Sequence, residues 1–370
     1  MNEELRGYFS IIDDPRCDCD VHYPLADILI IVMCAVLSGM KTLDDLVDYG
    51  ELKAETLERI FAIHKIPSRT TFARILSILD PELVGQAILT FVKNKWGNPG
   101  NQIAFDGKAI RATHKKGHEQ PLHILSAMAT QTGITLASMN VPEKTNEIPM
   151  IREMIELLNI EGKTVTADAL NTQKETVARI VEKKGDYVLP VKENHKTFYH
   201  DIRFYLLDLI LKHEAQGLDY ASTTEGTKAK TVLRECWVLS DFETFGESEQ
   251  WVGLRSLIAL RRTTIKHGIE TVGEWNFFIS NLHSEPLEFL SIIRSHWSIE
   301  SMHWWGDVIL GEDASRFGST AAQLTLNTLR KLALAVHKDF KLKTNSKKSL
   351  KSSMTRTLLD DTRLMDLITL

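Results

Sequence analysis

Apolar residues recur at helical intervals through the first part of the chain, up to about residue 97. Helix-start signals fit this periodicity. Pro24 suits a first helical turn, Ser68 is placed to cap the segment after it, and Pro81 can open another helix. Few strand signals interrupt this region. We therefore predict an N-terminal helical domain over residues 1–98.

Short apolar runs alternate with amphipathic segments from residue 102 onward. Strands are predicted at 102–106, 122–130, 134–141, 163–167 and 186–191, and helices at 147–158 and 172–184. Strand signals return between 218 and 282, and helical signals resume at Leu287. This order predicts an α/β fold with a mixed sheet flanked by helices and a β-rich insertion.

The predicted domain boundaries follow these changes of pattern. The helical domain is followed by the first part of the α/β core at 99–217 and by the β-rich insertion at 218–283. Helices that complete the core follow at 284–340, and a tail follows at 341–370. The stretch from Lys338 to Arg356 holds seven basic residues and one acid. We therefore interpret the end of the chain as a solvated basic tail.

The most apolar stretch runs from Leu25 to Met40 and carries Asp27. It is shorter than the ~20 residues that a membrane span needs, so we interpret it as a buried helix. The N-terminal residues MNEELRGYF show no basic region followed by an apolar run, so no signal peptide is indicated. We expect a protein without a membrane partner.

The cysteines favour a reducing compartment. The four of them, at positions 17, 19, 34 and 236, do not form the pattern of a disulfide framework, and we expect a cytoplasmic protein. Cys17, Cys19 and His22 provide three zinc ligands without a clear fourth, which is not a structural zinc site. The net charge of −5 mildly disfavours nucleic-acid binding, although a local basic patch can bind DNA on an acidic chain.

Two aspartates end predicted strands. Asp106 ends the run IAFD and Asp168 ends the run TVTAD, 62 residues further on. Loops at strand ends are where α/β sheets commonly build their sites. Two carboxylates there could share divalent cations such as Mg²⁺, and a third carboxylate from a helix would complete a site for two ions ~3.5–4 Å apart.

Each acid also has a simpler interpretation. An Asp-Gly pair after a strand is most often a turn. Asp168 could cap the helix that follows it. A glutamate on an amphipathic helix is usually solvated. Taken one by one, these residues do not identify an active site.

Separate blocks along residues 8 to 340 together resemble the H-repeat-associated family of DDE transposases, which bacterial insertion sequences encode. The matching blocks occur in the same order as in the family, and they are HYPL, IPSRTTFARIL, IAFDGKAIR, EKTNEIP, GKTVTADALNTQKE, KKGDYVLPVKENH, FFISNL, IRSHWSIE, GEDASR and LRKLALAV. The family's catalytic residues match Asp106, Asp168 and Glu300. Glu300 lies 132 residues after Asp168, and the β-rich insertion falls between them.

This resemblance implies an RNase H-like catalytic core. It implies an enzyme that nicks DNA hydrolytically and then transfers the strand, with Asp106, Asp168 and Glu300 as catalytic residues and as ligands of two Mg²⁺ or Mn²⁺ ions. The substrates would be the terminal repeats of the element and target DNA. Because two ends must be brought together, a homo-oligomer on DNA is expected. The helical domain over 1–98 is the expected DNA-binding region.

Further residues near the matched motifs are candidates for contacts with DNA, namely Lys108, Arg111, Lys192, Asn194, Arg294 and His296. For the charged ones the alternative is ordinary surface charge. His296 could hold a phosphate, orient Glu300 or simply pack. We interpret Glu147 as a helix-start residue favoured by the helix dipole, with support of the site as the alternative. Core packing is the favoured interpretation of Trp297, Trp304 and Trp305.

The chain departs from the family pattern after Glu300. Ser301 stands where the family has Asn, and one residue is missing before His303. A one-residue deletion rotates the rest of a helix by about 100°, so Asp307 would leave its usual face unless a bulge compensates. Gly306 weakens the helix further. His195 also replaces the family's Gln.

Two other functions therefore remain open. One is a catalytically impaired or domesticated derivative that binds DNA without cutting it. The other is an RNase H-like nuclease with no role in transposition, which would cleave without preferring element ends.

Overall fold

A computed structural model describes residues 2–16, 21–97, 100–113, 121–142, 146–212, 218–227, 229–240, 242–315 and 319–369. Cys17 and Cys19, which entered the zinc hypothesis, lie outside these residues. The chain forms two compact units. Unit 1 comprises Met1–Pro99, Gly107–Thr145 and Glu300–Leu370, and unit 2 comprises Gly100–Asp106 and Asn146–Ile299.

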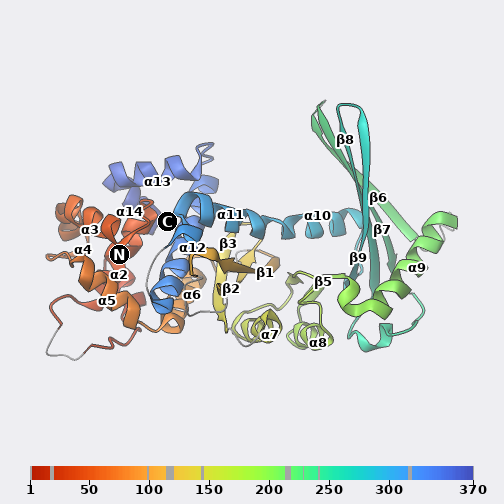
Figure 1. Cartoon of the computed structure of the whole chain (residues 1–370), viewed down its shortest axis with the longest axis horizontal. Coiled ribbons are helices and arrows are strands. Elements are labelled where there is room, and N and C mark those ends of the chain that lie inside the picture. The colour runs from red at the N-terminus through yellow and green to blue at the C-terminus, as the bar shows by residue number, and fades with distance from the viewer. Residues whose placement is uncertain are drawn as a thin grey trace. The chain divides into compact units, whose positions relative to one another are not determined.

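The helices of unit 1 come from both ends of the chain (Figure 1). They are α1 (Asn2–Phe9), α2 (Leu25–Leu37), α3 (Leu43–Leu52), α4 (Ala54–Phe61), α5 (Arg69–Ile78), α6 (Pro81–Trp96), α12 (Thr320–Lys343), α13 (Leu350–Leu359) and α14 (Asp361–Thr369). Helix α11 (Ser298–Leu310) begins at the end of unit 2 and lies mostly in unit 1. The predicted starts are confirmed: the Ser68 side chain accepts a hydrogen bond from Thr71 N, and Pro81 opens α6.

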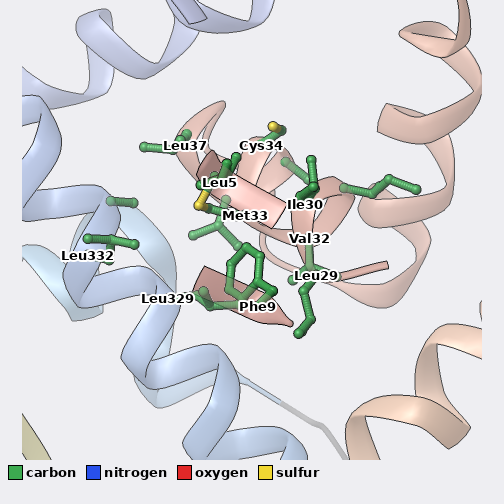
Figure 2. Packing of buried hydrophobic residues seen from close by; sticks show 14 of the residues in the cluster. Leu5, Phe9, Leu29, Ile30, Val32, Met33, Cys34, Leu37, Leu329 and Leu332 are labelled. Carbon is green, nitrogen blue, oxygen red and sulfur yellow. The ribbon is translucent and has the colours of Figure 1, made fainter. Parts of the chain in front are cut away.

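Helix α2 forms the centre of the unit 1 core. Its residues Leu29, Val32 and Met33 are buried, as predicted for this apolar stretch. Figure 2 shows Phe9 of α1 and Leu329 of α12 in the same hydrophobic cluster. Segments some 300 positions apart in sequence therefore share one core, and burying each large apolar side chain contributes ~1.5–3 kcal/mol.

The end of the chain is folded rather than solvated. Leu364, Leu367 and Ile368 of α14 are buried in the hydrophobic core that contains α2. Met354 of α13 is buried as well. The interpretation of 341–370 as a solvated basic tail is therefore wrong. This segment has an apolar helix face despite its basic composition, because Leu364, Leu367 and Ile368 stand at helical intervals of three and four.

The sheet has the strand order β3-β2-β1-β4-β5-β9-β8-β7-β6. The strands are β1 (Gln102–Ile110), β2 (Leu122–Ala129), β3 (Ile134–Val141), β4 (Thr164–Thr166), β5 (Asp186–Val191), β6 (Leu218–Thr227), β7 (Lys230–Ser240), β8 (Ser256–Lys266) and β9 (Ile269–Ser280). β1, β4 and β5 run parallel, whereas β2–β3 and β5–β9–β8–β7–β6 are antiparallel. The predicted mixed sheet is confirmed.

The helices of unit 2 flank its strands (Figure 1). They are α7 (Glu147–Leu157), α8 (Lys174–Glu182), α9 (Lys196–Lys212) and α10 (Pro286–His296). Phe289 and Ile293 of α10 pack in a cluster with Val238 and Ile258 of the long strands β7 and β8. Those strands occupy the segment predicted as β-rich. The arrangement is the α/β fold with a mixed sheet flanked by helices and a β-rich segment that the sequence predicts.

Within the described parts of the chain, no single helix combines the length and the apolar character of a membrane span. One bent pair, α5 with α6, meets that test only when the two helices are taken together.

Candidate active site

Asp106 and Asp168 are brought together by the register of two parallel strands. Ala104 of β1 pairs with Thr166 of β4, and each aspartate lies two residues beyond its paired residue. Side chains two apart in an extended strand point to the same face. Asp168 follows the end of β4, and the charge of Asp106 acts on its carboxyl group, so the two carboxylates lie close together at the carboxyl end of β4. Both side chains are partly buried.

The surroundings of Asp168 concentrate negative charge. Burial raises the pKa of Asp168, and the nearby charges of Glu147 and Asp106 raise it further. Asn171 opposes this shift, because its backbone N donates to Asp168 Oδ1 at 3.1 Å and its side-chain Nδ2 donates to the same oxygen at 2.8 Å. Helix α8 begins only at Lys174, with Gln173 at its N-cap. Asp168 therefore closes a turn with Asn171 and does not cap the helix.

Glu147 is both a helix-start residue and a neighbour of the aspartates. It is the first residue of α7, and 8% of it is exposed. Its Oε2 accepts a hydrogen bond from Asn171 Nδ2 at 2.9 Å. The fully buried Asn171 thus links Glu147 to Asp168. Sequence analysis missed Asn171, although its position three residues after Asp168 is the usual spacing for a side chain that binds a neighbouring turn.

A divalent cation fits this set of donors. The carboxylates of Asp106 and Asp168 lie close together, and Glu147 adds a third negative charge. Among the described residues, no three His, Cys, Asp or Glu side chains form a ready-made metal cage. That is compatible with Mg²⁺, which is commonly bound by one or two carboxylates, with water and substrate phosphates as its other ligands.

His296 fastens the end of α10 to the strand that precedes Asp168. Its Nδ1 lies 3.0 Å from Thr166 Oγ1. Burial lowers the pKa of His296, and the charge of Asp106 opposes that shift. Gln102 of β1 strengthens the attachment, since its Nε2 donates to Ile292 O at 2.9 Å. The position of the ring fits the packing interpretation better than contact with a phosphate.

The turn after β5 is fastened to the loop that follows Asp168. Asn194 Nδ2 donates to Ala169 O at 2.7 Å, and His195 Nε2 lies 2.6 Å from Thr172 O. Asn194 therefore has a structural contact beside Asp168. Lys192, at the start of this turn, is exposed.

The other basic candidates differ in their surroundings. Lys108 is mostly buried and forms ion pairs with Asp307 and, at 2.8 Å, with Glu312. The ammonium group of Lys108 is therefore engaged within the protein. Arg294 forms an ion pair with Glu225 of β6. Arg111 remains 86% exposed, with Asp313 Oδ2 3.8 Å from its Nε.

Glu300 lies in the first turn of α11 and is exposed. The helix continues without a bulge to Leu310, and Asp307 on it pairs with Lys108. Gly306 has a packing role, because a Cβ there would lie 2.8 Å from Glu312 Oε2. Thus the departures that follow Glu300 are accommodated in a regular helix.

The tryptophans near Glu300 do not form a core cluster. Trp297 is 58% exposed and Trp304 is 56% exposed, so the prediction of core packing is wrong for both. Trp305 is partly buried, and Lys338 Nζ lies 4.1 Å from the centre of its ring.

Comparison with known families agrees with these features. Residues 97–336 match the family described as Transposase DDE domain, and residues 6–92 match the region described as DDE_Tnp_1-associated. The chain therefore belongs to the DDE transposases, and its relatives include members of the H repeat-associated group.

Two curated relatives span almost the same length. YncI of Escherichia coli O157:H7, provisionally named a transposase, is 30% identical over 92% of this chain and 88% of its own length. YhhI of Escherichia coli K12, provisionally named an H repeat-associated transposase, is 28% identical over 90% of each chain. A solved synaptic complex of the piggyBac transposase with hairpin DNA aligns with a TM-score of 0.42 and 12% identity, covering 99% of this chain and 78% of that chain.

Proposed function

We propose that this protein cleaves DNA at the ends of an insertion sequence and joins those ends to target DNA. Asp106, Asp168 and Glu300 would act as the catalytic carboxylates. The observation that carries the proposal is the register of β1 and β4, which brings the two aspartates close together. The DDE transposases generally use divalent metal ions, and the negative charge around Asp168 supports the same requirement here.

The geometry of two elements supports the role of Glu300. Asp106 and Lys108 are two residues apart in β1 and so share a strand face. Glu300 and Asp307 are seven residues apart in α11, which leaves them within about 20° of the same helix face. The ion pair between Lys108 and Asp307 therefore lies on the helix face that also carries Glu300.

Two Mg²⁺ or Mn²⁺ ions at this site would activate the attacking water or 3′-hydroxyl and stabilise the leaving oxygen. The protein's own contribution is to hold the carboxylates. Asn171 fixes the orientation of Asp168 through two hydrogen bonds. His296 attaches α10 to β4, four residues before Glu300.

The DNA would be bound by exposed cations beside the carboxylates. Lys192 and Arg111 are exposed, and each belongs to a segment next to one of the aspartates. Asn194 would keep the Lys192 turn in place. Lys108, Arg294 and His296 are less suited to direct contact with phosphate because each has a partner within the protein. Joining two ends would require at least two copies of the chain on DNA.

A cleavage assay tests this function directly. The purified chain is incubated with Mg²⁺ and with DNA carrying the inverted repeats that flank its gene. The wild type should nick at the repeat ends, whereas Asp106→Asn, Asp168→Asn and Glu300→Gln should each lose nicking. Asp219→Asn changes an exposed aspartate of β6 and should nick like the wild type.

The same assay separates the competing functions. Specific binding without nicking by the wild type would contradict a catalytic role and favour a DNA-binding derivative. Cleavage with equal rates on unrelated DNA would favour a nuclease without a role in transposition. Binding should weaken steeply as salt rises, because phosphate contacts release counterions.

A further inference from the structure

A buried cluster of charged side chains joins β1, α11 and the segment after α11. Glu312 is only 1% exposed. Lys108 Nζ donates to Glu312 Oε2 at 2.8 Å, and Asn327 Nδ2 of α12 donates to Glu312 Oε1. Lys108 also donates to Asp307 of α11. A single ammonium group is thus shared by two carboxylates that belong to different elements.

The cluster is built to keep Glu312 charged. Burial raises the pKa of Glu312, but the charges of Lys331 and Lys108 outweigh this effect and hold the pKa below its usual value. Gly306 leaves the space that the carboxylate needs, since a Cβ there would lie 2.8 Å from Oε2. Buried ion pairs contribute little net stability compared with apolar packing. Such a cluster is therefore better explained by the geometry that it fixes.

The geometry concerns the same elements that carry two of the proposed catalytic carboxylates. Lys108 follows Asp106 by two residues on one face of β1. Asp307 follows Glu300 by two helical turns on one face of α11. The Lys108 ammonium fixes how α11 lies against this part of β1. A shift or rotation of α11 would have to break a buried ion pair.

We propose that Lys108 is a positioning residue, which acts through Asp307 and Glu312 to fix the orientation of α11 and of Glu300 at its start. This inference rests on the proposed function. Lys108 itself would touch neither the DNA nor the metal ions. Its role would be to preorganise Glu300 before the ions bind.

The test compares Lys108→Met, Glu312→Gln and the double variant. Mn²⁺ affinity is measured by calorimetry, together with the midpoint of thermal unfolding, binding to end DNA and the single-turnover rate of cleavage. Each single variant should bind Mn²⁺ about 10–100-fold more weakly, as is typical when a group that orients metal ligands is removed. Binding to DNA should change less than twofold.

The double variant separates positioning from stability. Each single variant removes the ion pair between Lys108 and the buried Glu312 and should unfold at a lower temperature. The double variant removes both charges, so it should regain much of the lost unfolding temperature while Mn²⁺ affinity and cleavage stay low. Recovery of Mn²⁺ affinity in parallel with stability would overturn the inference, because it would indicate a packing role alone.

A surface ion pair provides the matched control. Lys184 Nζ lies 3.1 Å from Glu161 Oε1, and both side chains are exposed. Lys184→Met and Glu161→Gln remove the same charges and should leave Mn²⁺ affinity and cleavage unchanged. If the wild type binds Mn²⁺ and cleaves, and Lys108→Met does both equally well, only the inference fails. A wild type that does neither would refute the proposed function, and the inference with it.

Discussion

Asn171 and Asp168 are joined twice, by the backbone N of Asn171 at 3.1 Å and by its side-chain Nδ2 at 2.8 Å, both to Asp168 Oδ1. The same Nδ2 also reaches Glu147 Oε2. Asn171 is fully buried, so its amide cannot be replaced there by bulk water. The orientation of one proposed metal ligand therefore depends on a residue that carries no charge.

Replacement of Asn171 by Ala should slow cleavage without abolishing DNA binding. Loss of the side-chain hydrogen bond frees Asp168 to rotate, and the expected loss of single-turnover rate is about 10–100-fold. Asn159→Ala is the control, since Asn159 is exposed and only caps a local turn through Glu161 N. Equal cleavage rates for Asn171→Ala and Asn159→Ala would exclude this role.

Gly306→Ala should destabilise the protein, although Ala favours helices by ~1 kcal/mol over Gly. The new Cβ would lie 2.8 Å from Glu312 Oε2 and push the carboxylate away from its partners. Disturbing a buried charged hydrogen bond costs about 1–3 kcal/mol, which exceeds the gain in helix propensity. Urea unfolding measures the difference in free energy.

Gly85→Ala in α6 is the matched control for Gly306→Ala, because a Cβ at Gly85 would meet nothing within 4 Å. Gly85→Ala should stabilise by up to ~1 kcal/mol. If both substitutions stabilise the protein equally, the Glu312 carboxylate is more mobile than its contacts indicate.

Local patterns predicted most of the fold. The strands predicted at 102–106, 163–167 and 186–191 correspond to β1, β4 and β5. The expected strand end at Asp106 is wrong, because β1 continues through Gly107 to Ile110. The proximity of Asp106 to Asp168 agrees with the expectation that neighbouring strands bring the two carboxylates together. Which strands are neighbours depends on contacts between distant segments, and for that the resemblance to a family was needed.

The wrong predictions concern residues whose surroundings depend on segments far away in the sequence. Lys108 resembles a free surface cation in sequence, yet its partners Asp307 and Glu312 are 199 and 204 residues away. No local pattern indicates such a pair. Trp297 was predicted to pack in the core because tryptophans usually do, but the position at the junction of α10 and α11 leaves it exposed.

His337 should make the stability of unit 1 depend on pH. Burial lowers its pKa to about 4 from 6.5, while the hydrogen bond to Leu37 O opposes the shift. Below pH 6.5 the unfolded chain binds a proton that the folded chain does not bind until about pH 4. Stability should therefore fall as pH falls through this window, by at most about 3 kcal/mol from this residue.

Chemical unfolding of wild type and His337→Gln at pH 7 and pH 5 measures this contribution. The variant should be less stable at pH 7, because His337 also contacts Ser353, but it should lose less stability between the two pH values. His22→Gln alters an exposed histidine and should keep the wild-type dependence. An unchanged pH dependence in His337→Gln would mean that other groups dominate.

The folded end of the chain gives the clearest test of unit 1. Leu367 of α14 is fully buried, whereas Leu359 at the end of α13 is 77% exposed. Leu367→Ala should cost about 2–5 kcal/mol, as other large-to-small core substitutions do, because it leaves a cavity in the core that contains α2. Leu359→Ala should change the free energy of unfolding by less than about 0.5 kcal/mol, since it alters only surface. Urea unfolding of the two variants distinguishes a packed C-terminal helix from a solvated tail, for which both changes would be equally small.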